Sequence, residues 1–414
     1  LDNFINFSPK SEFFSHNLLS SSITDSFVLI YFFKQKLNKR SLKNINKMSK
    51  KKILLIQPFY FYTGHYFQAT NNLIKNLKLF KNYEFLVSIN KNIKNKSFHK
   101  DFLKLKKIKK IHTFNSFSKS DSRLNIISSI FKLISLRNKF DVFHYLDSNI
   151  IILSYFNYLF KFFLKKNKIN LFIFYGPEVL NKSKIKLFFF KSFLKNNNVN
   201  IYLRTKNLEA AWKKYLPQSK KKIKTVKSLD FPTFKAFKKN KKKKISFGIV
   251  GQIRDGKSIY LLNDYFKKNT EYKFNIIGGF ANDKVKSKFN YLDKSFIKSK
   301  NFLTFENILK ESNKLDYIIL LYDHLFDHRI DISTLYLAVR LRTPVICFKK
   351  RGWLYQRVKE YNCGFTIKNF SEFKNFPKKN TYKYLSYIKG LKKFEKDNFN
   401  IILNEKNFYK SITK

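Results

Sequence analysis

The chain has 414 residues, of which 85 are Lys or Arg and 27 are Asp or Glu, so its formal net charge is +58. Hydrophobic residues make up 44% of the sequence and aromatic residues 18%, which is too apolar for a disordered basic tail. Two cysteines are too few for a disulfide scaffold or a cysteine-based zinc module, and ten glycines and seven prolines exclude collagen-like and low-complexity architectures.

The positive charge favours anionic neighbours such as phospholipid surfaces, nucleotides or nucleic acid. Lys, Asn, Ile, Phe and Tyr are abundant, while Gly, Ala, Pro and Trp are scarce. These two groups are encoded by AT-rich and GC-rich codons respectively. The base composition of the gene is therefore an equally good explanation for much of the charge.

The first 47 residues are expected to be a non-native extension. The only methionine is Met48, and a short polar stretch and then the apolar run 53–56 follow it, which is how many α/β proteins begin. We therefore expect translation to start at Met48 and residues 1–47 to be an over-extended reading frame. The alternative is a targeting segment with its apolar part at 26–33, although this part is short and no small-residue cleavage site follows.

From residue 52 onward, strand-like and helix-like segments alternate, which predicts β-α-β units around parallel sheets. Short continuous apolar runs predict strands that are buried on both faces, and apolar residues at helical spacing predict the helices between them. In the first half the expected strands are 53–56, 85–89, 141–144 and 171–174, and the expected helices are 66–80 and 150–164.

Two segments are especially rich in apolar residues, namely 150–164 and 187–194. Neither reaches the roughly 18 uninterrupted apolar residues that indicate a membrane-spanning helix. Both are expected to be helices that face the core. A second interpretation stays open, in which they lie on a membrane surface and their Lys side chains extend to water.

A change of composition over 217–244, with two prolines and a run of four lysines, predicts a boundary between two domains. The alternation then restarts, with strands expected at 245–250, 274–277, 317–321 and 344–347 and helices at 258–268 and 333–341. The predicted fold class is α/β, with two Rossmann-like, doubly wound domains that face each other across a ligand cleft at the carboxyl ends of their strands. The expected parts are an N-terminal domain over 48–230, a basic linker over 231–244, a C-terminal domain over 245–395 and a helical tail over 396–414.

The segment 248–257, Gly-Ile-Val-Gly-Gln-Ile-Arg-Asp-Gly-Lys, joins a predicted strand to a predicted helix. A glycine such as Gly251 lets the backbone approach a ligand closely, and the start of the helix offers free N–H groups. Arg254 and Lys257 are then suited to bind a diphosphate, Arg254 through two parallel hydrogen bonds and Lys257 as a point charge.

Further candidate residues follow the next predicted strands. Gly278 and the glycine after it form either a tight turn or a second loop that lines the same crevice. Tyr322 follows the strand at 317–321. Asp331, Ser333 and Thr334 stand at the start of a predicted helix, where they either cap the helix or hold an anionic or hydroxylated ligand.

In this order, the segments resemble the C-terminal domain of GT-B-fold glycosyltransferases of the retaining, glycogen-synthase-like kind. In that superfamily a Gly-x-Ile-Arg-x-x-Lys loop binds the diphosphate of a sugar nucleotide, and Arg254 and Lys257 match its basic pair. Tyr322 matches a tyrosine of the donor site, with Leu321 where proline is usual, and Ser333 falls near the small-residue turn.

The N-terminal half resembles the same family more loosely. Thr63 and Gly64 lie in a segment similar to the glycine loop that faces the acceptor and the donor phosphates, and His65 follows them directly. The stretch 141–144 is similar to the strand of the family that ends in histidine, here His144. The resemblance implies that His65 and His144 are catalytic residues that contact the acceptor or the sugar, while a structural role for each histidine is an open alternative.

Some positions depart from the family pattern. Many members carry two glutamates eight residues apart before the Pro-Val-Ile strand, where this chain has Arg329 and Leu337. Tyr175 stands where the family has a loop histidine. Because the two acids contact the ribose and sugar of the donor, an inactive scaffold that keeps the fold is an alternative to a divergent enzyme.

The resemblance implies a glycosyltransferase that moves a sugar from a nucleotide-diphosphate donor to an acceptor hydroxyl, in surface polysaccharide or glycolipid synthesis. No metal and no cofactor are expected, because cationic side chains and helix N-termini would stabilise the leaving diphosphate electrostatically. The expected partners are the nucleotide sugar, a glycan or lipid-linked acceptor and an anionic membrane surface, with the chain in the cytoplasm at the inner face of the plasma membrane. The rival class is a basic nucleic-acid-binding α/β protein, but nucleic acid is not expected as a partner because no RNA-recognition or zinc-finger signature is present.

Overall fold

The computed structural model describes the chain from residue 51 to residue 414 with internal gaps. The residues that it does not describe are 1–50, 60–64, 78–81, 90–109, 116–121, 181–182, 228, 233, 235–243, 254–255, 281–282, 299–304 and 323–331. The expected extension over 1–47, and with it the expected start at Met48, lies outside the described residues.

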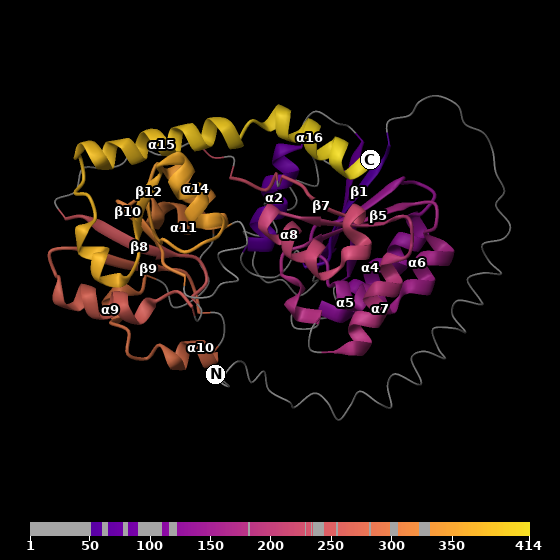
Figure 1. Ribbon diagram of the computed structural model, residues 1–414, viewed down its shortest axis with the longest axis horizontal. Helices are drawn as coiled ribbons and strands as arrows, with labels where there is room; N and C mark the ends of the chain where they lie inside the picture. The colour runs from indigo at the N-terminus through magenta and orange to yellow at the C-terminus, as the bar shows by residue number, and fades with distance from the viewer. Residues whose placement is uncertain are drawn as a thin grey trace. The chain divides into compact units, whose positions relative to one another are not determined.

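A sheet of seven parallel strands forms in the first half of the chain, in the order β3-β2-β1-β4-β5-β6-β7 (Figure 1). The four predicted strands are present, and the central ones are buried along their whole length, as continuous apolar runs predict. The bounds are β1 Ile53–Gln57, β2 Tyr83–Ile89, β3 Ile111–Asn115, β4 Val142–Tyr145, β5 Lys168–Ile173, β6 Val199–Leu203 and β7 Ile223–Thr225.

Helices connect these strands, namely α2 His65–Asn76, α4 Ser122–Leu136, α5 Ile150–Tyr155, α6 Asn157–Phe163, α7 Lys184–Leu194 and α8 Lys206–Tyr215, with short 3-10 helices at Pro177–Leu180 and Pro217–Lys222. The single helix expected over 150–164 is in fact two helices, which meet at Phe156. At this break the side chain of Asn157 bonds to α7 and its C-terminal end, donating to Ser192 Oγ at 2.9 Å and accepting from Asn196 Nδ2 at 2.7 Å. These bonds hold α6 against α7.

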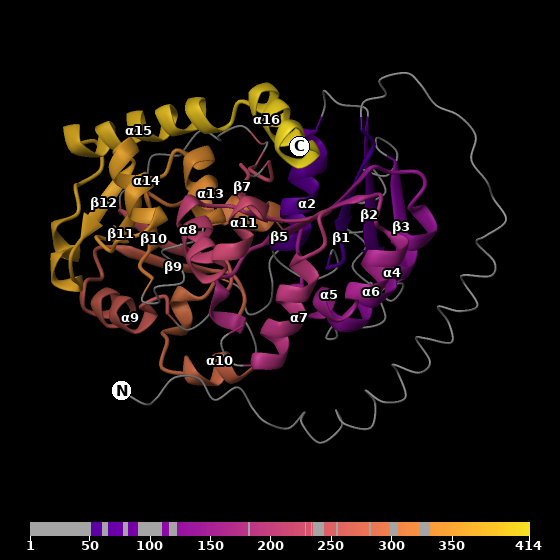
Figure 2. The same ribbon diagram turned by 45° about the vertical axis from the view of Figure 1, so that its right-hand side comes forward.

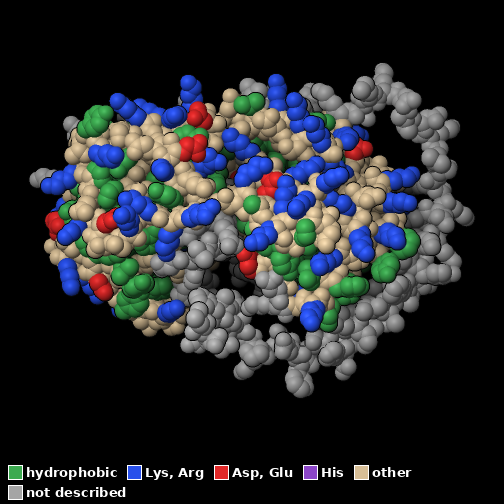
Figure 3. Space-filling view, in the orientation of Figure 1, with side chains coloured by type: hydrophobic (Ala, Val, Ile, Leu, Met, Phe, Trp, Pro, Cys, Tyr) green, Lys and Arg blue, Asp and Glu red, His purple; other side chains and the backbone are tan. Residues whose placement is uncertain are grey.

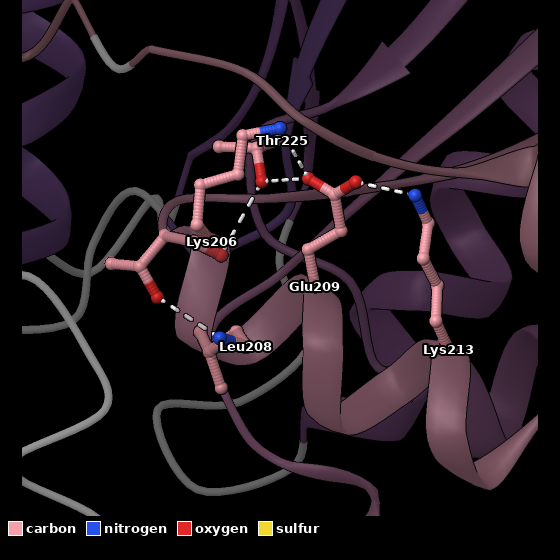
Figure 4. A network of polar contacts seen from close by, with 6 residues as sticks. Lys206, Leu208, Glu209, Lys213 and Thr225 are labelled. Atoms are coloured by element: carbon pink, nitrogen blue, oxygen red, sulfur yellow. Dashed lines mark hydrogen bonds and ion pairs between the residues drawn. The ribbon is translucent and has the colours of Figure 1, made fainter. Parts of the chain in front are cut away.

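Glu209 of α8 ties this helix to the edge strand β7 (Figure 4). Its carboxylate accepts hydrogen bonds from Lys213 Nζ at 2.5 Å, from Lys206 Nζ at 3.0 Å and from the hydroxyl of Thr225. Burial alone would raise the pKa of Glu209, but the hydrogen bonds outweigh burial and lower this pKa to about 2. The carboxylate is therefore ionised at neutral pH and holds the last strand of the sheet to α8.

A second sheet of five parallel strands follows, in the order β12-β11-β10-β8-β9. Its strands are β8 Ser246–Val250, β9 Lys273–Ile277, β10 Tyr317–Leu320, β11 Val345–Phe348 and β12 Gly364–Ile367. Its helices are α9 Ile259–Lys268, α10 Asp283–Lys288, α11 Phe305–Ser312, α13 Ser333–Leu341, α14 Trp353–Tyr361 and α15 Tyr382–Asn398, with 3-10 helices at Lys294–Phe296 and Phe370–Asn375. Two parallel sheets with interleaved helices are the α/β class that the sequence predicts.

The last two helices contact different sheets. Helix α15 packs on α13 and α14 of the second sheet (Figure 2), and Glu395 of α15 pairs with both Arg340 and Arg342. Helix α16 (Ile401–Thr413) packs on the first sheet, where Asn170 Nδ2 donates to the carbonyl of Ile412 at 2.8 Å and the Tyr202 hydroxyl donates to that of Ser411 at 2.6 Å. In the described part of the chain, no helix combines the length and the apolar character that crossing a bilayer requires.

Candidate functional site

Strand order gives each sheet one point where ligands of open α/β folds usually bind. In the first sheet the chain leaves β1 for β2 on one side and returns to β4 on the other side. In the second sheet β9 and β10 likewise lie on opposite sides of β8. The carboxyl ends of β1 and β4, and those of β8 and β10, therefore mark the two candidate sites, because a crevice forms where the direction of winding reverses.

Two glycines meet at the carboxyl edge of the second sheet. Gly251 follows β8, has φ +94° and donates its N–H to the carbonyl of Ile277 at 2.9 Å. Gly278 follows β9 and has φ +149°, and a Cβ atom there would lie 2.1 Å from the Gly251 carbonyl oxygen. A Cβ atom on Gly251 would meet nothing within 4 Å. The backbone at Gly251 is thus supported by Gly278 and open to a ligand on its own Cα side.

The basic end of the same loop leads into α9. Lys257 is buried, with 8% of its surface exposed, and Ser258 has the left-handed φ of +46° immediately before the helix. Arg254 lies outside the described residues. The structure therefore brings Gly251 and Gly278 together and sets Lys257 two residues before the first residue of α9. The diphosphate role of these residues stays a prediction.

The other predicted donor residues follow β10. Tyr322 is buried and its side chain belongs to the hydrophobic core. Ser333 is exposed and Thr334 is half-buried, and both lie inside the first turn of α13. The capping position before them is Ile332, whose side chain makes no capping bond, so neither residue is the N-cap that the alternative interpretation required. Asp331 lies outside the described residues.

In the N-terminal half, the predicted glycine loop with Thr63 and Gly64 is also outside the described residues. His65 is the first residue of α2, and its side chain is not described. Of the two predicted catalytic histidines, the structure describes the side-chain surroundings of His144 alone.

A small pocket of about 50 Å³ opens near the carboxyl ends of the central strands of the first sheet. A volume of this size holds a few water molecules. It includes residues at or just after the ends of β1, β4, β5 and β6, and α2 and α16 also contribute. Its lining residues are Gln57, Ala69, Thr70, Leu73, His144, Leu146, Phe172, Phe174, Arg204, Leu229, Asp230 and Phe408.

An ion pair between Arg204 and Asp230 forms one wall of this pocket. The two side chains are only 9% and 12% exposed. The guanidinium of Arg204 also lies over the rings of Phe174 and Phe172, at 4.7 and 5.7 Å from their centroids. Sequence reasoning missed this pair, and the only local signal was a basic residue directly after the apolar strand β6.

His144 is 1% exposed and lies among three aromatic rings. The ring centroids of Phe408, Tyr202 and Phe172 are 5.5, 5.8 and 6.1 Å from that of the imidazole. Its Nδ1 atom has no hydrogen-bond partner among the described residues. Burial lowers the pKa of His144 to about 3, so the ring is neutral at physiological pH. A neutral imidazole can donate or accept a hydrogen bond at the pocket, and its catalytic role stays a prediction.

Replacing His144 with phenylalanine is expected to make the free energy of unfolding less sensitive to acid. Below the unfolded-state pKa of 6.5, the unfolded chain binds a proton that the folded His144 does not bind, so folded-state stability falls as the pH drops. Between pH 6.5 and 5 this one group contributes a loss of about 2 kcal/mol, from about 1.4 kcal/mol per pH unit. Urea unfolding at pH 7.5 and 5.0 measures this difference in the parent and the variant.

His112 supplies the matched control. It is partly exposed and pairs with Glu84 at 2.6 Å, so it does not share the buried, unpartnered setting of His144. His112→Gln should keep the acid sensitivity that His144→Phe loses. An equal loss of stability between pH 7.5 and 5.0 in His144→Phe and in the parent would contradict the assignment to His144.

No protein-family model and no curated protein matches this chain, whereas solved structures do. HepE of Anabaena, solved with UDP and glucose, aligns over 88% of this chain and 99% of its own, with 10% identity and a TM-score of 0.61. A glycosyltransferase of Rickettsia africae aligns over 88% and 99%, with 13% identity and a TM-score of 0.57. S. aureus TarM, in a complex that includes UDP, aligns over 87% and 100%, with 11% identity and a TM-score of 0.57.

The chain has the GT-B fold. The predicted GT-B resemblance and fold class are therefore confirmed at the level of architecture. At 10–13% identity the similarity shows the fold alone. The described part of the GT-B chain contains no group of three His, Cys, Asp or Glu side chains that could hold a metal ion.

Proposed function

We propose that this chain is a glycosyltransferase that moves a sugar from a nucleotide-diphosphate donor to an acceptor hydroxyl. The observation that carries the proposal is the pair Gly251 and Gly278 on a GT-B fold, which leaves backbone open to a ligand beside a basic loop and the start of α9. HepE and TarM are both described in complexes with UDP, which supports a nucleoside diphosphate as the leaving group here.

The chemistry follows from the charge that develops on the leaving diphosphate. Lys257 and Arg254 supply positive charge, and the first turn of α9 supplies N–H groups and the positive end of the helix dipole. Because Lys257 is largely shielded from water, its charge acts on the diphosphate with little screening. These groups lower the barrier without a metal ion in this proposal. Tyr322, Ser333 and Thr334 are proposed to contribute to the nucleotide or sugar part of the donor site.

The acceptor is proposed to be a glycan or a lipid-linked sugar, in surface polysaccharide or glycolipid synthesis at the cytoplasmic face of a membrane. The carboxyl edge of the first sheet, with His65, His144, Thr63 and Gly64, is proposed to face the acceptor. A nucleic-acid partner has no support, because the structures that this chain resembles include sugar-transferring enzymes.

Incubation with a panel of UDP-, GDP- and dTDP-sugars in the presence of EDTA tests the proposal. Release of the nucleoside diphosphate with at least one donor is expected, and Arg254→Ala with Lys257→Ala should reduce the rate by about 100-fold or more. Lys267→Ala with Lys268→Ala, two exposed lysines at the far end of α9, is the control and should keep the parent rate.

The inactive-scaffold alternative gives a different result. Nucleotides would then raise the thermal unfolding temperature of the parent, but no sugar donor would be turned over with any acceptor. Release that is equal in the parent and in the double variant would remove the basic loop from the proposal.

A further inference from the structure

Helices α5, α6 and α7 of the first sheet are neighbours (Figures 1 and 2). Each of them carries exposed large apolar side chains. Monomeric proteins usually expose such side chains singly, so a group of them marks a binding surface. We define the aromatic patch as Tyr155, Tyr158, Phe162, Ile185 and Phe188, which are 43%, 63%, 69%, 65% and 67% exposed.

Ring contacts link the aromatic patch in two groups, one within α6 and one between α5 and α7. Tyr158 stacks on Phe162 with ring centroids 6.5 Å apart. Phe189 of α7 forms the second group, because its ring is 4.9 Å from that of Tyr155 on α5 and 5.7 Å from that of Phe188 on α7. The helices beneath are held together by the Asn157 hydrogen bonds described above. The exposed rings are therefore carried by a packed support.

The opposite faces of α6 and α7 are buried in the core. Phe160, Phe190 and Phe193 are fully buried, and the rings of Phe160 and Phe193 pack edge to face at 5.1 Å. The helices thus face the core on one side, as predicted. Their other side presents the aromatic patch to the surroundings.

Lysines surround the aromatic patch, and acidic residues are almost absent. Residues 155–195 contain nine Lys and a single acidic residue, Glu178. In the space-filling view, hydrophobic side chains lie among Lys and Arg over this region (Figure 3). The exposed lysines of this stretch are Lys161, Lys165, Lys166, Lys184, Lys191 and Lys195.

We propose that the aromatic patch docks this chain on an anionic phospholipid surface. Aromatic and aliphatic side chains enter the boundary between head groups and acyl chains, while the lysines bind the lipid phosphates with their ammonium groups. A second copy of the chain is disfavoured as the partner, because it would bring the lysines of one patch against those of the other and like charges repel. A nucleic acid would stack its bases on the rings, but the aliphatic Ile185 offers it no stacking face.

Flotation of the full chain with vesicles tests the docking. We expect binding to phosphatidylcholine vesicles that contain phosphatidylglycerol, and much weaker binding to pure phosphatidylcholine or in high salt. Phe162→Ser with Phe188→Ser should weaken binding by about tenfold or more. Lys161→Gln with Lys184→Gln and Lys191→Gln should weaken it by about 100-fold on the anionic vesicles, from about fivefold for each lysine.

The control removes exposed apolar side chains from another surface. Tyr382→Ser with Leu403→Ser, which are 87% and 53% exposed on α15 and α16, should bind vesicles as the parent does. The thermal shift with nucleotides on each variant reports whether the fold and the donor site are intact, so this test and that of the proposed function fail independently.

Four results would overturn the docking surface. They are absence of binding to anionic vesicles, equal losses in the patch and control variants, a patch variant that changes only the oligomeric state in light scattering, and a patch variant that loses RNA binding while vesicle binding persists.

Discussion

Replacing Gly278 with alanine is expected to lower the free energy of unfolding by about 3 kcal/mol or more and to abolish nucleotide binding. The new Cβ atom would lie 2.1 Å from the carbonyl oxygen and 2.7 Å from the carbonyl carbon of Gly251, and backbone atoms cannot yield as a flexible side chain does. The φ of +149° adds strain for any residue with a side chain. Urea unfolding and a nucleotide thermal shift measure the two effects.

Gly251→Ala is the matched control. This residue also has a positive φ, +94°, but its Cβ atom would meet nothing within 4 Å. Only backbone strain is expected, which costs about 1–2 kcal/mol. If Gly251→Ala and Gly278→Ala were equally destabilising, the close approach of the two glycines would not be what shapes this edge of the sheet.

Replacing Asp230 with alanine is expected to cost about 3–5 kcal/mol of stability. The substitution leaves the guanidinium of Arg204, which is 9% exposed, without its carboxylate in an aromatic setting. The backbone on either side of Asp230 stays held to α2, because Asn76 Nδ2 donates to the carbonyls of Leu229 and Phe231. Denaturant unfolding of Asp230→Ala, and separately of Arg204→Ala, measures the loss of stability that each substitution causes.

The double variant Arg204→Ala with Asp230→Ala separates the pair from simple loss of packing. It should be more stable than the sum of the two single losses predicts, by about 2 kcal/mol, because neither charge is then buried alone. Additive costs would mean that the two side chains contribute independently, and the wall of the pocket would not depend on their pairing.

Central strands such as β1 and β10 could be predicted from sequence, because a parallel strand that is buried on both faces appears as a run of apolar residues. The two edge strands of the first sheet could not. β3 (Ile111–Asn115) contains His112 and Asn115, and β7 (Ile223–Thr225) has only three residues, with Lys224 in the middle. An edge strand is paired on one side only, so it needs no continuous apolar run.

In the candidate site, individual glycines could be predicted from sequence, but the contacts between distant residues could not. A glycine after a strand is a visible signal, so Gly251 and Gly278 could be singled out. Their direct contact could not, because it depends on the register that pairs Val250 with Ile277. Arg204 and Asp230 are 26 residues apart and meet only through the fold. No local sequence pattern predicts such a pair.

Calorimetric titration of the parent chain with a nucleoside diphosphate and with the matching nucleoside tests most directly that the second sheet binds the diphosphate. The diphosphate is expected to bind at least about 100-fold more tightly than the nucleoside, because charge-assisted contacts contribute about 1.5–3 kcal/mol each. Arg254→Ala with Lys257→Ala should remove that difference. Tight binding that persists in the double variant, or equal affinity for the nucleoside and its diphosphate, would contradict a diphosphate site at this loop.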